Sequence, residues 1–178
     1  MKVTVLSGLS FALGWITIKM VFFWAGIAES GLVPIVLINM LCLLLAISVG
    51  LYLHKRGATE QGNALSDIKN GLTAGLPYAI IVSVFIYFYY SSIDPGFNEH
   101  QIAEAQAGIS KMLETPEGLE EVRSSNPEFE VMTREEIYDS LRSGPEGFYN
   151  PTSTMTLSML AMLLLATLNS IFITVIYR

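Results

Sequence analysis

The sequence predicts an all-α membrane protein with four transmembrane helices and an insertion of short helices between the third and the fourth. Hydrophobic residues make up 52% of the 178 residues, and charged residues only 15%. The hydrophobic residues gather in four long runs, and about 20 helical residues cross a hydrocarbon core of about 30 Å. These runs lack the alternation of barrel strands, so helices must satisfy the backbone hydrogen bonds in lipid.

Three predicted spans precede the insertion and one follows it. Residues 1–93 contain the first three spans, residues 94–151 form the insertion, and residues 152–178 form the fourth span. The first three spans are expected at about residues 3–27, 32–53 and 72–90. The apolar stretch of the first span is longer than that of a signal peptide and contains a lysine, so we expect it to be retained.

The third span contains two features that affect helix packing. Gly71 and Gly75 in "GLTAG" have the spacing of small residues that lets two helices approach closely, although the motif is weak support for dimerisation. Pro77 is expected to kink or loosen the start of the helix.

Positive charges predict the orientation of the chain. Basic residues near span ends favour the cytoplasm, and they lie at both chain ends and between the second and third spans: Lys2, Lys55, Arg56, Lys69 and Arg178. The insertion has four basic and thirteen acidic residues, a net charge of −9. We expect both termini in the cytoplasm and the insertion on the outer side of the membrane, with membrane lipids as partners and no nucleic acid.

The insertion is patterned as three short helices rather than as a linker. Apolar residues recur at helical spacing from Ile102 to Leu113. Thr115 is an expected N-cap followed by proline at the first helical position, and Thr133 with Glu136 forms an expected capping box. The stretch "SGPEGFYNP" is expected to end the last of these helices.

The apolar stripes of these helices require cover from the rim of the bundle or from another protein. In the first interpretation, the insertion is a cap that only connects the third and fourth spans. In the second, it is a docking surface whose residues are Ile102, Ile109, Met112, Ile137, Tyr138 and Leu141.

Polar residues inside the spans form a second candidate site. They are Lys19, Asn39, Ser83, Tyr87 and Asn169. Counted at 1.5 Å per residue, Lys19, Asn39, Ser83 and Tyr87 share the outer half of the bilayer, so we expect one of the other three within hydrogen-bond reach of Lys19. Snorkelling to the outer interface is the alternative, although side chains lean toward a helix N-terminus. No Asp or Glu lies in a predicted span, which disfavours a proton pathway.

Asn169 lies in the inner half of the fourth span. An amide at such a position most often forms a hydrogen bond to a neighbouring helix. Ser10 and Ser48 have matching depths.

Catalytic patterns are absent from the sequence. Cys42 is the only cysteine, so neither a disulfide framework nor a thiolate metal cluster is expected. His54 and His100 are expected on opposite sides of the membrane, and no nucleophile, zinc or phosphate-binding motif occurs. We therefore expect no enzyme activity, no metal and no cofactor.

Residues 62–97 resemble an uncharacterised family of small four-span membrane proteins, a domain of unknown function found mainly in Bacteroidota. The resemblance consists of a polar loop entering the third span through a Lys-x-Gly step and an aromatic exit leading to Asp-Pro. The positions are Lys69, Gly71, Tyr87, Tyr90, Asp94 and Pro95. It implies a bacterial inner membrane and a four-helix layout, and no activity.

Two functions agree with these features. The first is a non-enzymatic accessory or scaffold subunit of a larger inner-membrane complex, with the acidic insertion as its docking surface. The alternative is a small transporter or channel component with a polar path around Lys19, Asn39, Ser83 and Asn169.

Overall fold

Helices form 93% of the computed structural model, which describes residues 2–26, 32–57 and 63–177. No strand occurs in these ranges. The α-helices are α1 (Lys2–Trp24), α2 (Leu32–Gly57), α3 (Ala64–Phe88), α4 (Pro95–Glu114), α5 (Pro116–Ser125), α6 (Arg134–Phe148) and α7 (Pro151–Ile176). The chain divides into two compact units, residues 1–86 with 155–178, and residues 87–154. The predicted all-α fold with short helices between the third and fourth spans is confirmed.

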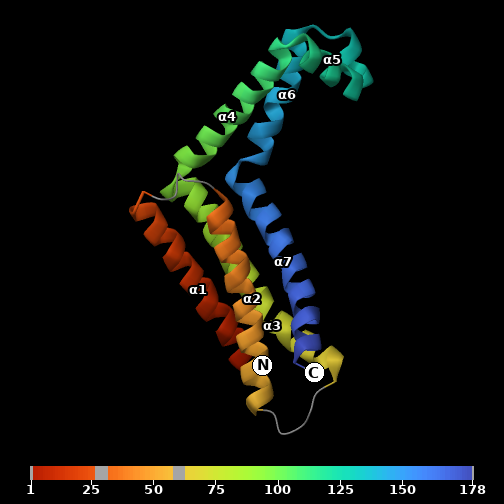
Figure 1. The fold of residues 1–178 in the computed structure, drawn as a ribbon. Helices are drawn as coiled ribbons and strands as arrows, with labels where there is room; N and C mark the ends of the chain where they lie inside the picture. Colours follow the sequence, from red (N-terminus) through yellow and green to blue (C-terminus); the bar gives the residue numbers. More distant parts are fainter. Residues whose placement is uncertain (1, 27–31, 58–62, 178) are drawn as a thin grey trace. The chain divides into compact units, whose positions relative to one another are not determined.

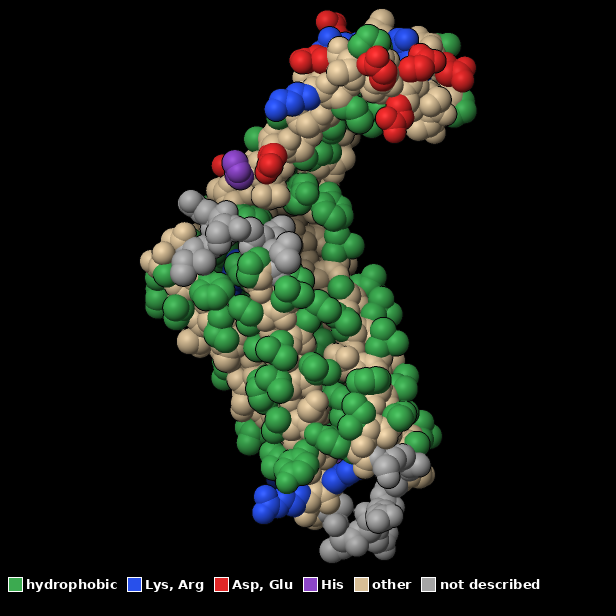
Figure 2. All heavy atoms as spheres, viewed as in Figure 1, with side chains coloured by type: hydrophobic (Ala, Val, Ile, Leu, Met, Phe, Trp, Pro, Cys, Tyr) green, Lys and Arg blue, Asp and Glu red, His purple; other side chains and the backbone are tan. Residues whose placement is uncertain are grey.

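The first unit contains the four helices that are long and apolar enough to cross a membrane: α1, α2, α3 continued to Ile93, and α7. They lie side by side (Figure 1), and the two chain ends lie at the same end of the unit. Large hydrophobic side chains cover its visible face (Figure 2), while glycine, alanine, serine and tyrosine occupy much of the interior of α3. This distribution suits a helical bundle in lipid, where small residues allow close packing.

The glycines predicted to allow close approach pack against α7 of the same chain. A Cβ atom added to Gly71 would lie 2.8 Å from Ser170 Oγ, and one added to Gly75 would lie 2.7 Å from Ala166 Cβ. The small residues of α3 therefore match a second small pair on α7, in antiparallel order. This contact is within the chain and uses the face that dimerisation would need.

The helix that contains the predicted third span begins before residue 72. α3 starts at Ala64, because the Asn63 side chain caps it by accepting from the backbone N–H of Ser66 at 2.8 Å. Pro77 consequently lies in the middle of α3 rather than at its start. The helix α2 likewise extends past the predicted second span, as far as Gly57.

A π-helix, η2 (Tyr89–Ile93), continues α3 into the second unit. Such turns are rare and cluster at functional positions. Here Tyr90 packs edge-on against Tyr89 and stacks at a tilt on Phe97, with ring centroids 5.0 and 5.3 Å away. The Tyr89 hydroxyl donates to Asp94 Oδ2 at 3.1 Å. The aromatic exit and the Asp-Pro step thus form one local cluster.

The second unit has its own hydrophobic core. The core consists of Leu113, Val122, Phe129 and Ile137, with Ile109, Leu119, Met132, Tyr138 and Leu141 packed around it. These residues come from α4, α5, α6 and the 3₁₀ helix η3 (Pro127–Val131). The three predicted short helices are confirmed, and η3 is an addition to them.

The predicted helix caps of this unit and the predicted end of its last helix are confirmed. Thr115 caps α5 by accepting from the backbone N–H of Gly118, and Thr133 forms the capping box with Glu136. α6 includes Pro145 and ends at Phe148, inside the stretch "SGPEGFYNP" that was predicted to end it. Pro145 lies near the helix end, where the lost N–H costs one hydrogen bond, and its carbonyl still accepts from Tyr149 N–H at 2.9 Å.

Candidate functional site

Lys19 is buried inside the four-helix unit and only 4% exposed. Its neighbour one turn earlier on α1, Trp15, is also buried and meets Phe85 of α3 edge-on, with ring centroids 6.0 Å apart. The side chain of Lys19 is thus enclosed by protein rather than spread over the lipid-facing surface. This burial agrees with the helix-interior interpretation of Lys19.

The residues predicted to bond with Lys19 have other arrangements. Asn39 accepts a hydrogen bond from the Tyr78 hydroxyl at 2.6 Å, and its Nδ2 lies 3.6 Å from Met162 Sδ. The Ser83 hydroxyl is buried and has no hydrogen-bond partner in the described part of the chain. Asn39 therefore joins α2 to α3 and α7, and the predicted pairing of Lys19 with Asn39 or Ser83 is not observed.

Tyr87 and Asn169 do not extend this arrangement into a polar path. Tyr87 is exposed, and its ring meets Phe88 edge-on, with centroids 5.7 Å apart. Asn169 is half-buried, and within the described ranges its amide has no hydrogen bond to Ser10 or Ser48. The next residue, Ser170, faces the bundle and donates to the Ala166 carbonyl. Adjacent positions on a helix differ by about 100°, so Asn169 lies beside the buried stripe of α7.

A partly buried ion pair joins α2 and α3 at the end of the four-helix unit where α7 ends, and it was not predicted from the sequence. Lys55 Nζ of α2 lies 2.9 Å from Asp67 Oδ2 of α3, and Asp67 is 3% exposed. Lys55 also donates to the Tyr177 carbonyl, just past α7, at 3.3 Å. Both residues were assigned to a loop, because the third span was expected to begin at residue 72. The capping residue Asn63 was the signal that places Asp67 on a helix.

The predicted docking residues of the second unit are only partly available to a partner. Ile137 is fully buried, while Ile109, Tyr138 and Leu141 pack against the same core. Ile102 is half-buried, and Met112 is exposed. The apolar stripes of α4 and α6 pack against each other in this core. The expectation that the bundle or a partner protein must bury them is therefore wrong.

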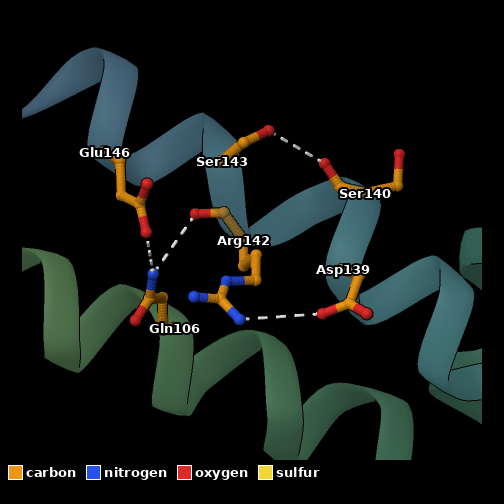
Figure 3. Close-up of polar contacts among 6 residues, drawn as sticks. All are labelled: Gln106, Asp139, Ser140, Arg142, Ser143 and Glu146. Carbon is orange, nitrogen blue, oxygen red and sulfur yellow. Dashed lines mark hydrogen bonds and ion pairs between the residues drawn. The ribbon is translucent and has the colours of Figure 1, made fainter.

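Polar side chains bridge α4 and α6 beside this core (Figure 3). Gln106 Nε2 of α4 donates to Glu146 Oε1 at 3.1 Å and to the Arg142 carbonyl at 3.3 Å. Along α6, Arg142 lies 3.7 Å from Asp139. These bonds fix the separation of the two helices on a surface dominated by carboxylates.

A groove of about 800 Å³ lies between α4 and the start of α6. It is lined by Ser110, Leu113, Thr133, Arg134, Glu135, Tyr138 and Asp139. Next to it, the backbone N–H and then the hydroxyl of Thr133 donate to Glu136 and hold the pKa of that carboxyl below its ordinary value. The groove lining therefore combines an apolar side chain, an aromatic ring and carboxyl groups.

A family model described as a protein of unknown function, DUF4199, matches residues 6–178. The chain belongs to the DUF4199 family. No curated protein and no solved structure matches it. The match covers nearly the whole chain of this DUF4199 protein, including both compact units. The α4–α6 unit is therefore part of what the family model describes.

The described residues of this DUF4199 protein hold no group of three or more His, Cys, Asp or Glu side chains that could bind a metal ion. Cys42, the single thiol, is buried in α2, where such a residue acts as a small hydrophobic side chain. The side chains described above offer hydrogen bonds, ion pairs and apolar contacts.

Proposed function

We propose that this DUF4199 protein is a non-enzymatic accessory or scaffold subunit of a larger complex in the inner membrane of a bacterium, of the Bacteroidota. The four-helix unit anchors it in lipid with both termini in the cytoplasm. The α4–α6 unit lies in the periplasm and is its docking domain.

The observation that supports this proposal is the independent core of the α4–α6 unit. Two spans can be joined by a short loop, whereas this chain builds four helical segments around Leu113, Val122, Phe129 and Ile137. Acidic side chains gather on the surface of the unit (Figure 2). A folded, strongly charged domain that holds no metal-binding group in its described residues fits recognition of another protein.

The orientation rests on charge. Lys55 and Arg56 lie in the last turn of α2 and Lys69 lies near the start of α3, while residues 94–151 have a net charge of −9. Basic residues near span ends are retained in the cytoplasm, and acidic segments contribute little to orientation.

The test is purification at native expression level after gentle extraction with detergent. We expect the protein to migrate in a complex with a stoichiometric partner identified by mass spectrometry. The matched variant replaces residues 95–149 with a glycine–serine linker and keeps the four-helix unit, and we expect it to lose the partner. A wild-type protein that migrates alone refutes the scaffold role, and a linker variant that keeps its partner refutes docking through α4–α6.

A further inference from the structure

The groove between α4 and α6 is a concave site on the surface of the second unit. Its lining includes two hydrophobic side chains: Leu113, which is almost fully buried, and Tyr138, which is half-buried. The rim contains the hydroxyls of Ser110 and Thr133. At about 800 Å³, the groove has room for side chains of an incoming segment.

The charge of the groove is negative once its internal ion pair is counted. Arg134 contributes the one positive charge of the lining, and its Nη2 lies 3.5 Å from Glu114 Oε1, which offsets it. Glu135 has no ion pair to any described residue. Asp139 is 72% exposed, and its ion pair with Arg142 at 3.7 Å offsets part of its charge, so Glu135 is the lining carboxylate without an ion pair to a described residue.

The surroundings add to this negative potential. The insertion has thirteen acidic and four basic residues, and carboxylates concentrated around a concave site raise the local concentration of cations and steer their approach. The aromatic wall adds a second preference, since a cation is attracted to the face of a tyrosine ring and its aliphatic stem packs on apolar surface.

We infer that this groove binds a segment of a partner protein rich in lysine or arginine, with one basic side chain over Leu113 and Tyr138 and its charge beside Glu135 and Asp139. This inference rests on the proposed docking role of α4–α6 and names the chemistry of the partner.

The test uses the full chain in nanodiscs of phosphatidylcholine, a lipid without net charge. The probe is a fluorescent peptide of alternating lysine and serine, and a peptide of alternating glutamate and serine is its control. We expect the lysine peptide to bind and the glutamate peptide not to bind. Binding should weaken between about 0.05 and about 0.5 M salt, because screening reduces the attraction of exposed charges.

Two matched pairs of variants separate the groove from the general acidity of the unit. Glu135→Gln with Asp139→Asn removes two charges from the groove and should raise the Kd about tenfold. Glu128→Gln with Glu130→Gln removes two charges from η3, outside the groove lining, and should raise it less than about threefold. Equal effects of the two pairs show attraction to the whole acidic unit and overturn the inference.

A variant that fills the groove without changing charge gives a second measure. Ser110→Trp should weaken peptide binding about tenfold, whereas Ser124→Trp on the exposed side of α5 should leave it unchanged. Circular dichroism confirms that each variant keeps its helices. Unaltered binding by Ser110→Trp overturns the inference.

The partner complex distinguishes this inference from the proposed function. If the wild-type chain co-purifies with its partner and the groove variants retain it, the docking role stands and the groove inference is wrong. If the chain migrates alone while the groove variants still discriminate the lysine peptide, the groove inference stands and the scaffold role is wrong.

Discussion

Lys55 Nζ lies 2.9 Å from Asp67 Oδ2, and the two residues stand on opposite sides of the connection between α2 and α3. The carboxylate side chain is 4% exposed, while that of the lysine is 31% exposed. Because Lys55 also donates to the Tyr177 carbonyl, a single ammonium group links α2 to α3 and to the residue that follows α7. The pair therefore connects three helices at the end of the four-helix unit where α1 begins and α7 ends.

Lys55→Met should destabilise the bundle by about 2 kcal/mol, because it leaves the buried Asp67 carboxylate without its cation. The cost is lower than for a fully buried pair, because the partly exposed lysine is screened by solvent. The measurement is the free energy of unfolding in detergent micelles. The double variant Lys55→Met with Asp67→Asn should be less destabilised than Lys55→Met alone. Lys69→Met, at an exposed position on α3, is the control and should cost less than about 0.5 kcal/mol.

Gly8→Ala should destabilise the four-helix unit by about 2 kcal/mol or more, because the added Cβ would lie 2.2 Å from the Ala74 carbonyl oxygen and the helix backbones must move apart. Gly14→Ala is the matched change on the same helix, with nothing within 4 Å of its Cβ. It should be neutral or stabilising, since alanine favours helix by up to about 1 kcal/mol. Equal unfolding free energies for the two variants would show that α1 and α3 do not approach closely at Gly8.

Ile137→Ala should open the α4–α6 unit to proteases. Ile137 is fully buried in the core of that unit, and such a truncation costs about 3 kcal/mol. Val131→Ala, at a position 90% exposed, should leave the cleavage pattern unchanged. The measurement is limited proteolysis of intact membrane vesicles followed by mapping of the fragments. Rapid cleavage throughout residues 97–150 of the wild-type chain would contradict the core itself.

Acid should loosen the start of α6. Hydrogen bonds from Thr133 lower the pKa of Glu136 below its ordinary value of 4.5, so the contribution to stability is complete above that value and is lost as the pH falls through the lower folded-state pKa. Hydrogen-exchange protection factors for the first turn of α6 should therefore fall in acid. Glu136→Gln keeps a side chain that can form the capping box and should remove this part of the pH dependence.

Cysteine labels should report the proposed orientation. In a Cys42→Ser background, Gly57→Cys should react only from the cytoplasm, and Ser125→Cys only from the periplasm. Both positions are exposed, so a membrane-impermeant maleimide applied to cells and to inverted vesicles is a sufficient reagent. Labelling of both cysteines from the same side would refute the orientation derived from the basic residues.

Features that act within one helical turn could be predicted from the sequence. The capping box of Thr133 with Glu136 and the cap at Thr115 depend on neighbours three residues away. The four spans were also predictable, because membrane crossing depends on length and apolar composition. The start of α3 was not predicted, because residues 66–70 are polar apart from Ile68 and have the composition of a loop, although Asn63 is the type of residue that caps a helix.

Contacts between helices could not be derived in the same way. The spacing of Gly71 and Gly75 indicates that some helix packs closely there, but the choice of α7 depends on Ala166 and Ser170, far along the chain. For the same reason, depth alone suggested a bond between Lys19 and Asn39. The rotation of each helix about its axis decides such pairs, and Asn39 is turned toward Tyr78 and Met162.

The fit between α3 and α7 also constrains the order of events during synthesis. α4, α5 and α6 leave the ribosome before α7, so the α4–α6 core can close while the small-residue face of α3 still lacks Ala166 and Ser170. Until the final helix inserts, lipid or an insertion factor must occupy that face. A nascent chain halted before Pro151 would thus contain a folded α4–α6 unit and a four-helix unit that still lacks its last helix.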